Sequence, residues 1–198
     1  DGYRGAHNRD WIKEPEPALL ECFANRAQGA LKLVTMAAGL DASEDLIRTA
    51  RKLGIRVSLG HQKVTEDILA SAVKAGAGCL THLGNGVPHR LERHSNSLLA
   101  GLAEDGLAAM IIPDGHHLPE AWIKIILRTK GLGRTIAVSD ASPAAGLPPG
   151  DYRVFNQVVR ISDDGKLFNP ETGYLAGSAA SLTDCMNVLI SLRGNLLR

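Results

Sequence analysis

Residues 78–88 read GCLTHLGNGVP and combine a short apolar run, a histidine and a glycine-rich turn. The apolar run predicts a strand that ends at His82. Loops that follow stiff strand ends often carry binding and catalytic groups. The same plan recurs in VSLGH at 57–61, MIIPDGHH at 110–117 and IAVSD at 136–140. Four strands are therefore predicted to end in residues that bind a metal or move a proton.

Strand and helix patterns alternate along the first three quarters of the chain. The expected strands are Leu31–Met36, Ile55–Leu59, Cys79–Thr81, Ala108–Ile112 and Thr135–Ser139. The expected helices between them begin near Pro17, Ser43, Thr65, Ser95 or Asn96, and Pro119. This alternation indicates a parallel sheet with helices outside it. Short and wholly apolar strands are typical of a sheet that is covered on both faces.

An open doubly wound sheet and a (β/α)8 barrel both fit this α/β pattern. No GxGxxG follows the first strand, which removes the simplest dinucleotide-binding interpretation. The polar residues stand at the carboxyl ends of several strands, where TIM barrels build their active sites. We favour the barrel, and five strands would make it a partial one.

The pattern changes near Gly150 and divides the chain into three parts. Residues 1–149 form the partial barrel. Residues 150–175 read as a β hairpin of a small β domain, with DDGK at 163–166 as a turn. Residues 176–198 contain a last helix, capped near Ser181, which we expect to pack back on the barrel.

Composition excludes several classes of protein. The chain has 198 residues, 44% of them hydrophobic, and a formal net charge of +1, which is ordinary globular composition without a nucleic-acid-binding surface. No apolar run approaches the roughly 20 residues of a membrane span, and no signal peptide opens the sequence. Cys22, Cys79 and Cys185 form no CxxC pair. They read as free buried thiols in a reducing compartment, so we expect a cytoplasmic location.

Three strand-end residues suit metal-assisted hydrolysis. His61 and His82 are separated by one strand–helix–strand step, which places them at neighbouring strand ends, able to hold one ion. Asp140, from another strand end, could accept a proton from water and return it to a leaving group. Taken singly, each is more often a turn, surface or core residue. Asp114 reads as a turn residue and His116 has no special role.

Seven motifs together resemble the N-acetylglucosamine-6-phosphate deacetylases, a branch of the amidohydrolase superfamily. In chain order they are GAHN with His7, KLVTMA at 32–37, VSLGH, THLGN at 81–85, DGHH at 114–117, VSDAS at 138–142 and LAGSAASL at 175–182. The resemblance runs in register over nearly the whole chain. It implies a metal-dependent (β/α)8 barrel in which the five strands are the fourth to eighth, with a small β domain.

The resemblance also implies roles for the reacting groups. His61 and His82 would be metal ligands. Asp140 would be the general base that activates the metal-bound water, and then the acid that protonates the departing amine. His7 would hydrogen-bond the amide carbonyl as it becomes an oxyanion. The cofactor would be a divalent metal, with zinc the first choice and iron, manganese or cobalt also able to serve.

Other residues would bind the substrate, a small amino sugar. Asn85 and the backbone at Gly86 would face the sugar phosphate. Arg93 matches a phosphate-binding arginine that reaches across a dimer interface, so a homodimer is implied. His117, rather than His116, matches a substrate-contacting histidine. The implied reaction is hydrolysis of N-acetylglucosamine-6-phosphate to glucosamine-6-phosphate and acetate.

The sequence departs from the family in two places. The family has a metal-ligating glutamate in an HLEGP-like segment that would precede the stretch 1–7. We therefore expect an N-terminally truncated fragment that binds zinc weakly and is inactive alone. The loop 86–96 is also rewritten, with NGVP where the family usually has NAM. These departures leave two alternatives to the deacetylase interpretation. The protein hydrolyses another N-acyl or cyclic amide, or it is a non-catalytic barrel.

Overall fold

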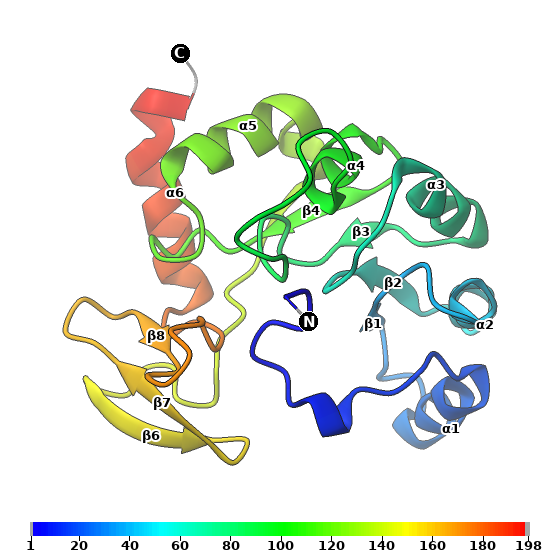
Figure 1. Ribbon diagram of the computed structural model, residues 1–198, viewed down its shortest axis with the longest axis horizontal. Coiled ribbons are helices and arrows are strands. Elements are labelled where there is room, and N and C mark those ends of the chain that lie inside the picture. The colour runs from blue at the N-terminus through cyan, green and yellow to red at the C-terminus, as the bar shows by residue number, and fades with distance from the viewer. Residues whose placement is uncertain (1, 197–198) are drawn as a thin grey trace.

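The computed structural model describes residues 2–196, which form a parallel main sheet and a small antiparallel sheet (Figure 1). The strands of the main sheet are β1 (Leu33–Met36), β2 (Arg56–Leu59), β3 (Cys79–Leu80), β4 (Ala108–Ile111) and β5 (Thr135–Ala137). They stand in the order β1-β2-β3-β4-β5, and every neighbouring pair is parallel. The sheet is open, with β1 and β5 at its edges, so the described residues form no closed barrel.

The strand order decides between the two expected α/β architectures. Each strand pairs with the next one in the sequence. A doubly wound sheet reverses its strand order at a switch point, whereas neighbouring strands of a (β/α) barrel follow one another without reversal. The doubly wound alternative is therefore wrong for the described chain.

Helices connect the strands and lie along the outer side of the sheet (Figure 1). Their bounds are η1 (Arg9–Trp11), α1 (Pro17–Ala27), α2 (Ser43–Lys52), α3 (Glu66–Ala75), α4 (Ser97–Ala103), α5 (Glu120–Lys130) and η2 (Leu132–Arg134). The Asn96 side chain caps α4 by accepting hydrogen bonds from the backbone of Leu98 and Leu99. The helix expected to begin near Ser43 is α2, and Ser43 is its first residue rather than its N-cap; the Ser43 hydroxyl donates to the Leu40 carbonyl.

The strands end earlier than the apolar runs in the sequence predict. The run expected to end at Ser139 leaves the ladder after Ala137. Val138 still donates to the Ile111 carbonyl, but two residues later Asp140 has a φ of 51°, which turns the chain away from the sheet. The polar residues at the ends of the predicted strands thus lie beyond the hydrogen-bonded part of the sheet. Their side chains need not alternate between the two faces of the sheet as strand residues do.

The main core lies between the sheet and the helices. Its buried side chains include Ile47, Val57, Leu69, Ile111 and Ile126. Both faces of β2 are buried apart from its first residue, as expected for an interior parallel strand. The expectation of three buried thiols is wrong in part. Cys79 and Cys185 are buried, but Cys22 is exposed on α1 because it lies on the side of the helix away from the buried Leu20.

The predicted hairpin is present in the small sheet. It contains β6 (Gly150–Val154), β7 (Gln157–Ile161) and β8 (Leu167–Phe168), all antiparallel. Phe155 and Asn156 both have positive φ, which gives the tight two-residue turn between β6 and β7. A separate core forms from Ala144, Val159, Ile161 and Leu167. The last helix, α6 (Leu182–Leu196), packs Leu189 and Leu192 against the main core.

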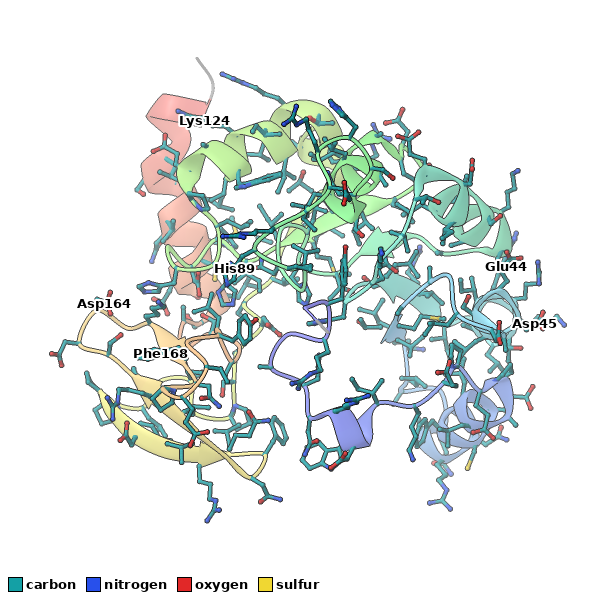
Figure 2. All side chains as sticks on the ribbon, in the orientation of Figure 1. Glu44, Asp45, His89, Lys124, Asp164 and Phe168 are labelled. Carbon is teal, nitrogen blue, oxygen red and sulfur yellow. The ribbon has the colours of Figure 1, made fainter. Side chains whose placement is uncertain are left out.

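The N-terminal segment and the small sheet meet beside the main sheet (Figure 1). Gln157 of β7 donates to the Ala6 carbonyl at 3.2 Å. His116, which follows β4, lies 3.1 Å from the backbone oxygen of Asp164. Figure 2 shows Asp164 at the tip of the small sheet. His89 stacks on Tyr174 with ring centroids 5.9 Å apart. The N-terminal segment, the loop that contains His89 and the loop after β4 therefore all contact the small sheet or the segment that follows it. No helix in the described range is long and apolar enough to span a membrane.

Candidate active site

Three histidine side chains meet where β2, β3 and the N-terminal segment come together. The Nε2 atom of His61 lies 3.0 Å from Nε2 of His82 and 3.3 Å from Nε2 of His7. The rings stand edge to face, with the His61 centroid 4.7 Å from that of His82 and 4.5 Å from that of His7. The sequence predicted that His61 and His82 adjoin, and the structure brings His7 to the same point.

The backbone fixes which nitrogen of His61 faces its neighbours. Its Nδ1 lies 2.9 Å from the Tyr3 carbonyl oxygen, which can only accept a hydrogen bond. Nδ1 therefore carries the hydrogen, and in the neutral ring Nε2 carries the lone pair. A carbonyl on the second nitrogen is a common way to orient a metal-ligating histidine. His82 is buried, and its Nδ1 has no hydrogen-bond partner among the described residues.

The half-buried His61 ring and the buried His82 ring both have lowered pKa values. Burial, followed by the nearby charge of His82, lowers the pKa of His61 to about 4, although the Tyr3 carbonyl and Asp140 oppose the shift. Burial also lowers the pKa of His82 to about 4, with repulsion from His117 and His7 contributing. Neutral imidazoles with exposed lone pairs are the form that binds metals.

These shifts predict how stability depends on pH in the metal-free protein. The native rings bind a proton only near pH 4, whereas the unfolded rings bind one near pH 6.5. Stability is therefore present above pH 6.5 and is lost as the pH falls toward 4. From pH 7 to pH 5 the pair of rings should contribute a loss of the order of 2–3 kcal/mol, less than two independent sites would, because part of the His61 shift is repulsion from His82. Urea unfolding at both pH values measures it. A His61→Asn/His82→Asn variant should lose less stability over that range, and an equal loss would contradict the account.

The three reacting residues expected at strand ends share an unusual backbone. His61, His82 and Asp140 have φ values of 53°, 34° and 51°. Residues other than glycine seldom adopt this left-handed region, and each costs of the order of 1–3 kcal/mol. Such conformations concentrate at functional sites, where the surrounding structure enforces them. Four other non-glycine residues in the described range also have positive φ, at helix ends and in a hairpin turn: Gln28, Ala42, Phe155 and Asn156. Among the non-glycine residues that directly follow strands of the main sheet, only the three that the motif pattern selects have it.

Gly86 closes the site against the His61 ring. Its φ is +65°, and a Cβ atom there would lie 2.9 Å from His61 Nδ1. Asn85, beside it, donates from its side chain to the His82 carbonyl at 3.3 Å. The turn that the sequence assigned to the sugar phosphate thus also packs on both predicted metal ligands.

Gly86→Ala is expected to destabilise the fold and to displace the His61 ring. The left-handed conformation alone costs about 1–2 kcal/mol for an L-residue. The clash with His61 adds to it. Gly54→Ala is the matched control, because Gly54 has a φ of +70° and open space where its Cβ would lie. Urea unfolding of both variants separates the two terms. An equal loss in both would show that Gly86 exerts no steric control over His61.

Asp140 lies three residues after the end of β5, and its carboxyl group interacts electrostatically with the nearby histidines. Burial raises the pKa of its carboxyl group, and the charges of His117, His61 and His7 partly offset that shift. Its side chain retains solvent exposure, so water can reach it. The backbone around it is fixed from the other side by Ser178, whose N–H donates to the Asp140 carbonyl at 2.8 Å. A carboxyl group whose pKa is raised can accept a proton and return it.

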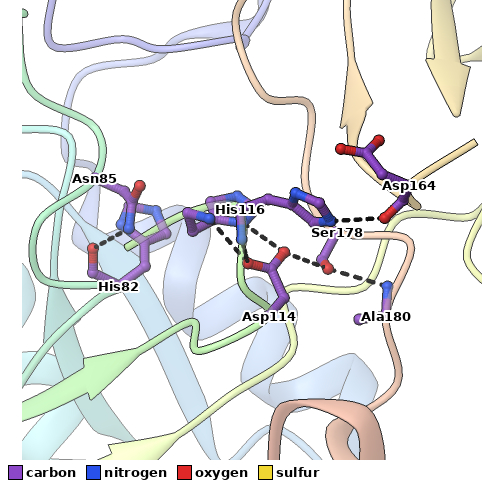
Figure 3. Close-up of polar contacts among 8 residues, drawn as sticks. His82, Asn85, Asp114, His116, Asp164, Ser178 and Ala180 are labelled. Atoms are coloured by element: carbon purple, nitrogen blue, oxygen red, sulfur yellow. Dashed lines mark hydrogen bonds and ion pairs between the residues drawn. The ribbon is translucent and has the colours of Figure 1, made fainter. Parts of the chain in front are cut away.

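Asp114 has a larger role than the turn predicted from the sequence. Its Oδ1 does form the turn, accepting from the backbone of His116 and His117 at 2.9 Å each (Figure 3). Its Oδ2 accepts from His117 Nδ1 and from the Ser178 hydroxyl, both at 2.7 Å. Burial acts to raise the pKa of Asp114, but the hydrogen bonds from His117 outweigh it and the net shift is downward. A DxxH spacing was the available sequence signal for this pair.

The other histidines and the arginine singled out from the sequence differ in how far they are buried. His117 is nearly buried beside Asp114, whereas His116 points to the small sheet and contacts Asp164. Arg93 lies exposed in the loop 86–96, and the described residues offer it no ion pair. Among residues 2–196, no hydrogen bond or ion pair joins Arg93 to the three histidines.

The donor set fits a divalent metal in part. In a tetrahedral zinc site with Zn–N distances of about 2.0–2.1 Å, two nitrogens stand about 3.3 Å apart. The Nε2 separations at His61 are of this size. No group of three or more His, Cys, Asp or Glu side chains in residues 2–196 is arranged to hold a metal. His61 and His82 thus supply two imidazole donors, whereas catalytic zinc usually has three protein ligands.

Two open clefts lie outside the histidine cluster. One, of about 360 Å³, is lined by Tyr3, Arg4, Arg9 and Ile12 and adjoins the carbonyl that holds His61. The other, of about 560 Å³, is lined by residues of the range 38–72 at the start of α2 and along α3. None of the candidate site residues lines the larger cleft.

Comparison with known proteins finds relatives of one kind. No family model matches the chain. It is 31% identical over 180 residues to the N-acetylglucosamine-6-phosphate deacetylase of Bacillus subtilis, covering 91% of this chain and 45% of that protein. It is 29% identical over 191 residues to an N-acetylgalactosamine-6-phosphate deacetylase of Escherichia coli O157:H7, covering 96% of this chain and 50% of that one.

Solved structures agree with the sequence relatives. The Mycobacterium smegmatis N-acetyl-D-glucosamine-6-phosphate deacetylase, solved as a mutant with N-acetyl-D-glucosamine-6-phosphate, superposes with a TM-score of 0.88 at 25% identity. The alignment covers 96% of this chain and 49% of that one. The Thermotoga maritima enzyme gives 0.84 at 28% identity, covering 97% and 51%. The resemblance seen in the motifs is confirmed: this chain matches the N-acetylglucosamine-6-phosphate deacetylases in sequence and fold, and it spans about half the length of the relatives it matches.

Proposed function

We propose that this chain carries the metal and proton chemistry of a deacetylase that hydrolyses N-acetylglucosamine-6-phosphate to glucosamine-6-phosphate and acetate. The observation that carries the proposal is the approach of His61 Nε2 to His82 Nε2 at 3.0 Å, with the Tyr3 carbonyl fixing the lone pair of His61 inward. The names of the sequence relatives and solved structures support the choice of substrate.

Amide hydrolysis needs an activated carbonyl, a deprotonated water and a proton for the departing amine, and the proposed site contains a group for each. His61 and His82 would hold a divalent metal, with zinc the first choice, which supplies Lewis acidity toward the carbonyl and toward water. The Asp140 carboxylate takes a proton from the attacking water and returns it to the amine nitrogen as the C–N bond breaks. The imidazole of His7 donates a hydrogen bond to the carbonyl oxygen as negative charge develops there.

The proposed architecture follows the same relatives. β1 to β5 would be the fourth to eighth strands of a (β/α)8 barrel within residues 1–149. Residues 150–175 would be part of the small β domain, and 176–198 the helix that returns to the barrel. We also propose a cytoplasmic enzyme and a homodimer, in which Arg93 reaches the phosphate of a neighbouring active site. An exposed Arg93 without an ion pair in the described chain supports this.

Substrate identity depends on residues around the loop 86–96. Asn85, the backbone of Gly86, Arg93 and His117 would contact the amino sugar. The similarity to an N-acetylgalactosamine-6-phosphate deacetylase makes the C4 epimer a second candidate substrate. Another N-acyl or cyclic amide remains the alternative that the rewritten loop favours.

Acetate release tests the proposal. The complete gene product and residues 1–198 alone are each assayed with N-acetylglucosamine-6-phosphate, its galactosamine epimer and unphosphorylated N-acetylglucosamine. We expect the complete product to hydrolyse the glucosamine phosphate fastest, and residues 1–198 alone to be inactive. Equal rates with and without the phosphate would reject the phosphorylated substrate. No hydrolysis of any of the three sugars by the complete product would reject the deacetylase.

A further inference from the structure

The four hydrogen bonds of Asp114 exceed what its turn requires. The two backbone bonds to Oδ1 close the turn at 114–117. The two on Oδ2 come from His117 Nδ1 and from Ser178, which is 64 residues away in sequence. The side chains of Asp114 and His117 are only 2% and 4% exposed. A carboxylate has about four acceptor positions, so this one is fully used inside the protein.

The contact with Oδ2 determines the form of the His117 ring. An ionised carboxylate can only accept, so His117 Nδ1 must carry the hydrogen. Nε2 is then the nitrogen left for a ligand, and in the neutral ring it is an acceptor. Because Asp114 is held by three further bonds, it cannot turn away to release the ring.

Ser178 couples this pair to the region of Asp140. Its hydroxyl donates to Asp114 Oδ2 (Figure 3). Its backbone N–H donates to the Asp140 carbonyl at 2.8 Å. Its carbonyl accepts from the Ser142 backbone at 2.9 Å. One residue of the segment before α6 thus fixes the ends of both β4 and β5, which places His117 and Asp140 relative to each other.

We propose that Asp114 is a positioning residue, which acts through His117 by holding that ring in the Nδ1–H form with Nε2 turned to the substrate. This rests on the proposed function, in which His117 contacts the amino sugar. The role goes beyond turn formation, because an asparagine would form the turn equally well through its Oδ1 but would present an N–H group to His117 Nδ1.

Asp114→Asn therefore separates the two roles. The protein is labelled with ¹⁵N in its histidines, and long-range ¹H–¹⁵N correlation spectra above pH 7.5 report which ring nitrogen is protonated. In the parent protein His117 should be protonated at Nδ1. Asp114→Asn should move the hydrogen toward Nε2 while unfolding stays cooperative. kcat of the complete gene product should fall by about 10- to 100-fold, the size of effect that outer carboxylate partners of histidine have in metal enzymes.

Two controls accompany the variant. His116 is the reference within each spectrum, because its Nε2 contacts the Asp164 backbone and not Asp114. Ser178→Ala removes the other hydrogen bond on Oδ2 and should leave the His117 tautomer unchanged.

The outcomes distinguish this proposal from the proposed function. A parent protein with His117 protonated at Nε2 overturns the positioning role, even if Asp114→Asn fails to fold. An unchanged tautomer and kcat in Asp114→Asn overturns it as well. The expected tautomer together with no hydrolysis by the complete gene product would support the geometry at His117 and reject the deacetylase function.

Discussion

Asp140→Asn is expected to lower kcat for deacetylation by about 10²- to 10⁴-fold, the usual contribution of a general base. The amide can neither take a proton from water nor return one to the amine. The backbone should tolerate the change, because asparagine adopts the left-handed conformation at least as readily as aspartate, and φ at this position is 51°. Zinc affinity should stay near that of the parent, since Asp140 is not one of the proposed ligands. Steady-state kinetics of the complete gene product measures the effect.

Asp163→Asn is the matched control for this substitution. Asp163 is an exposed aspartate in the turn between β7 and β8, and its replacement should leave kcat within twofold of the parent. Full activity in Asp140→Asn, or an equal loss in both variants, would show that another group moves the proton.

His61→Asn and His82→Asn are each expected to weaken zinc binding by at least about 100-fold, more than the loss of an outer partner of a ligand usually costs. Each variant removes one of two imidazole donors and keeps a side chain that accepts the positive φ of its position. Because we assign only two of the described side chains, those of His61 and His82, as ligands, residues 1–198 should bind zinc with a Kd no tighter than about 1 µM. Competition with a zinc chelator measures both quantities.

His116→Asn is the control for the metal ligands. His116 lies near the site in sequence and space but directs its Nε2 to the Asp164 carbonyl. Its replacement should leave zinc affinity unchanged. A Kd in the nanomolar range for residues 1–198, or equal losses from all three variants, would contradict a site made by His61 and His82.

The strand-end pattern predicted the centre of the site because it follows from topology. Parallel neighbouring strands bring their carboxyl ends to one edge, so histidines that follow β2 and β3 must lie close together. The same reasoning placed Asp140 after β5. The left-handed backbone at His61, His82 and Asp140 could not be predicted. Histidine and aspartate adopt this conformation more often than most residues but still seldom, so the surrounding packing decides where it occurs.

Contacts that depend on distant segments were missed for a related reason. The Tyr3 carbonyl that orients His61 is a backbone atom and leaves no mark in the sequence. Asp114 was understood correctly as a turn residue, since an aspartate before glycine favours a turn. Its second role depends on burial and on Ser178, which reaches it from the segment before α6. Pattern alone cannot show which polar side chains meet across such a distance.

Zinc titration of the ¹⁵N-histidine-labelled protein tests the central claim most directly. The claim is that His61 and His82 together bind a divalent metal through Nε2, the atoms that lie 3.0 Å apart. Long-range ¹H–¹⁵N spectra should show the Nε2 signals of both residues shifting together with added zinc, while His61 Nδ1 stays protonated against Tyr3. Spectra in which neither Nε2 signal responds, or in which only His89, His94 or His116 responds, would contradict it.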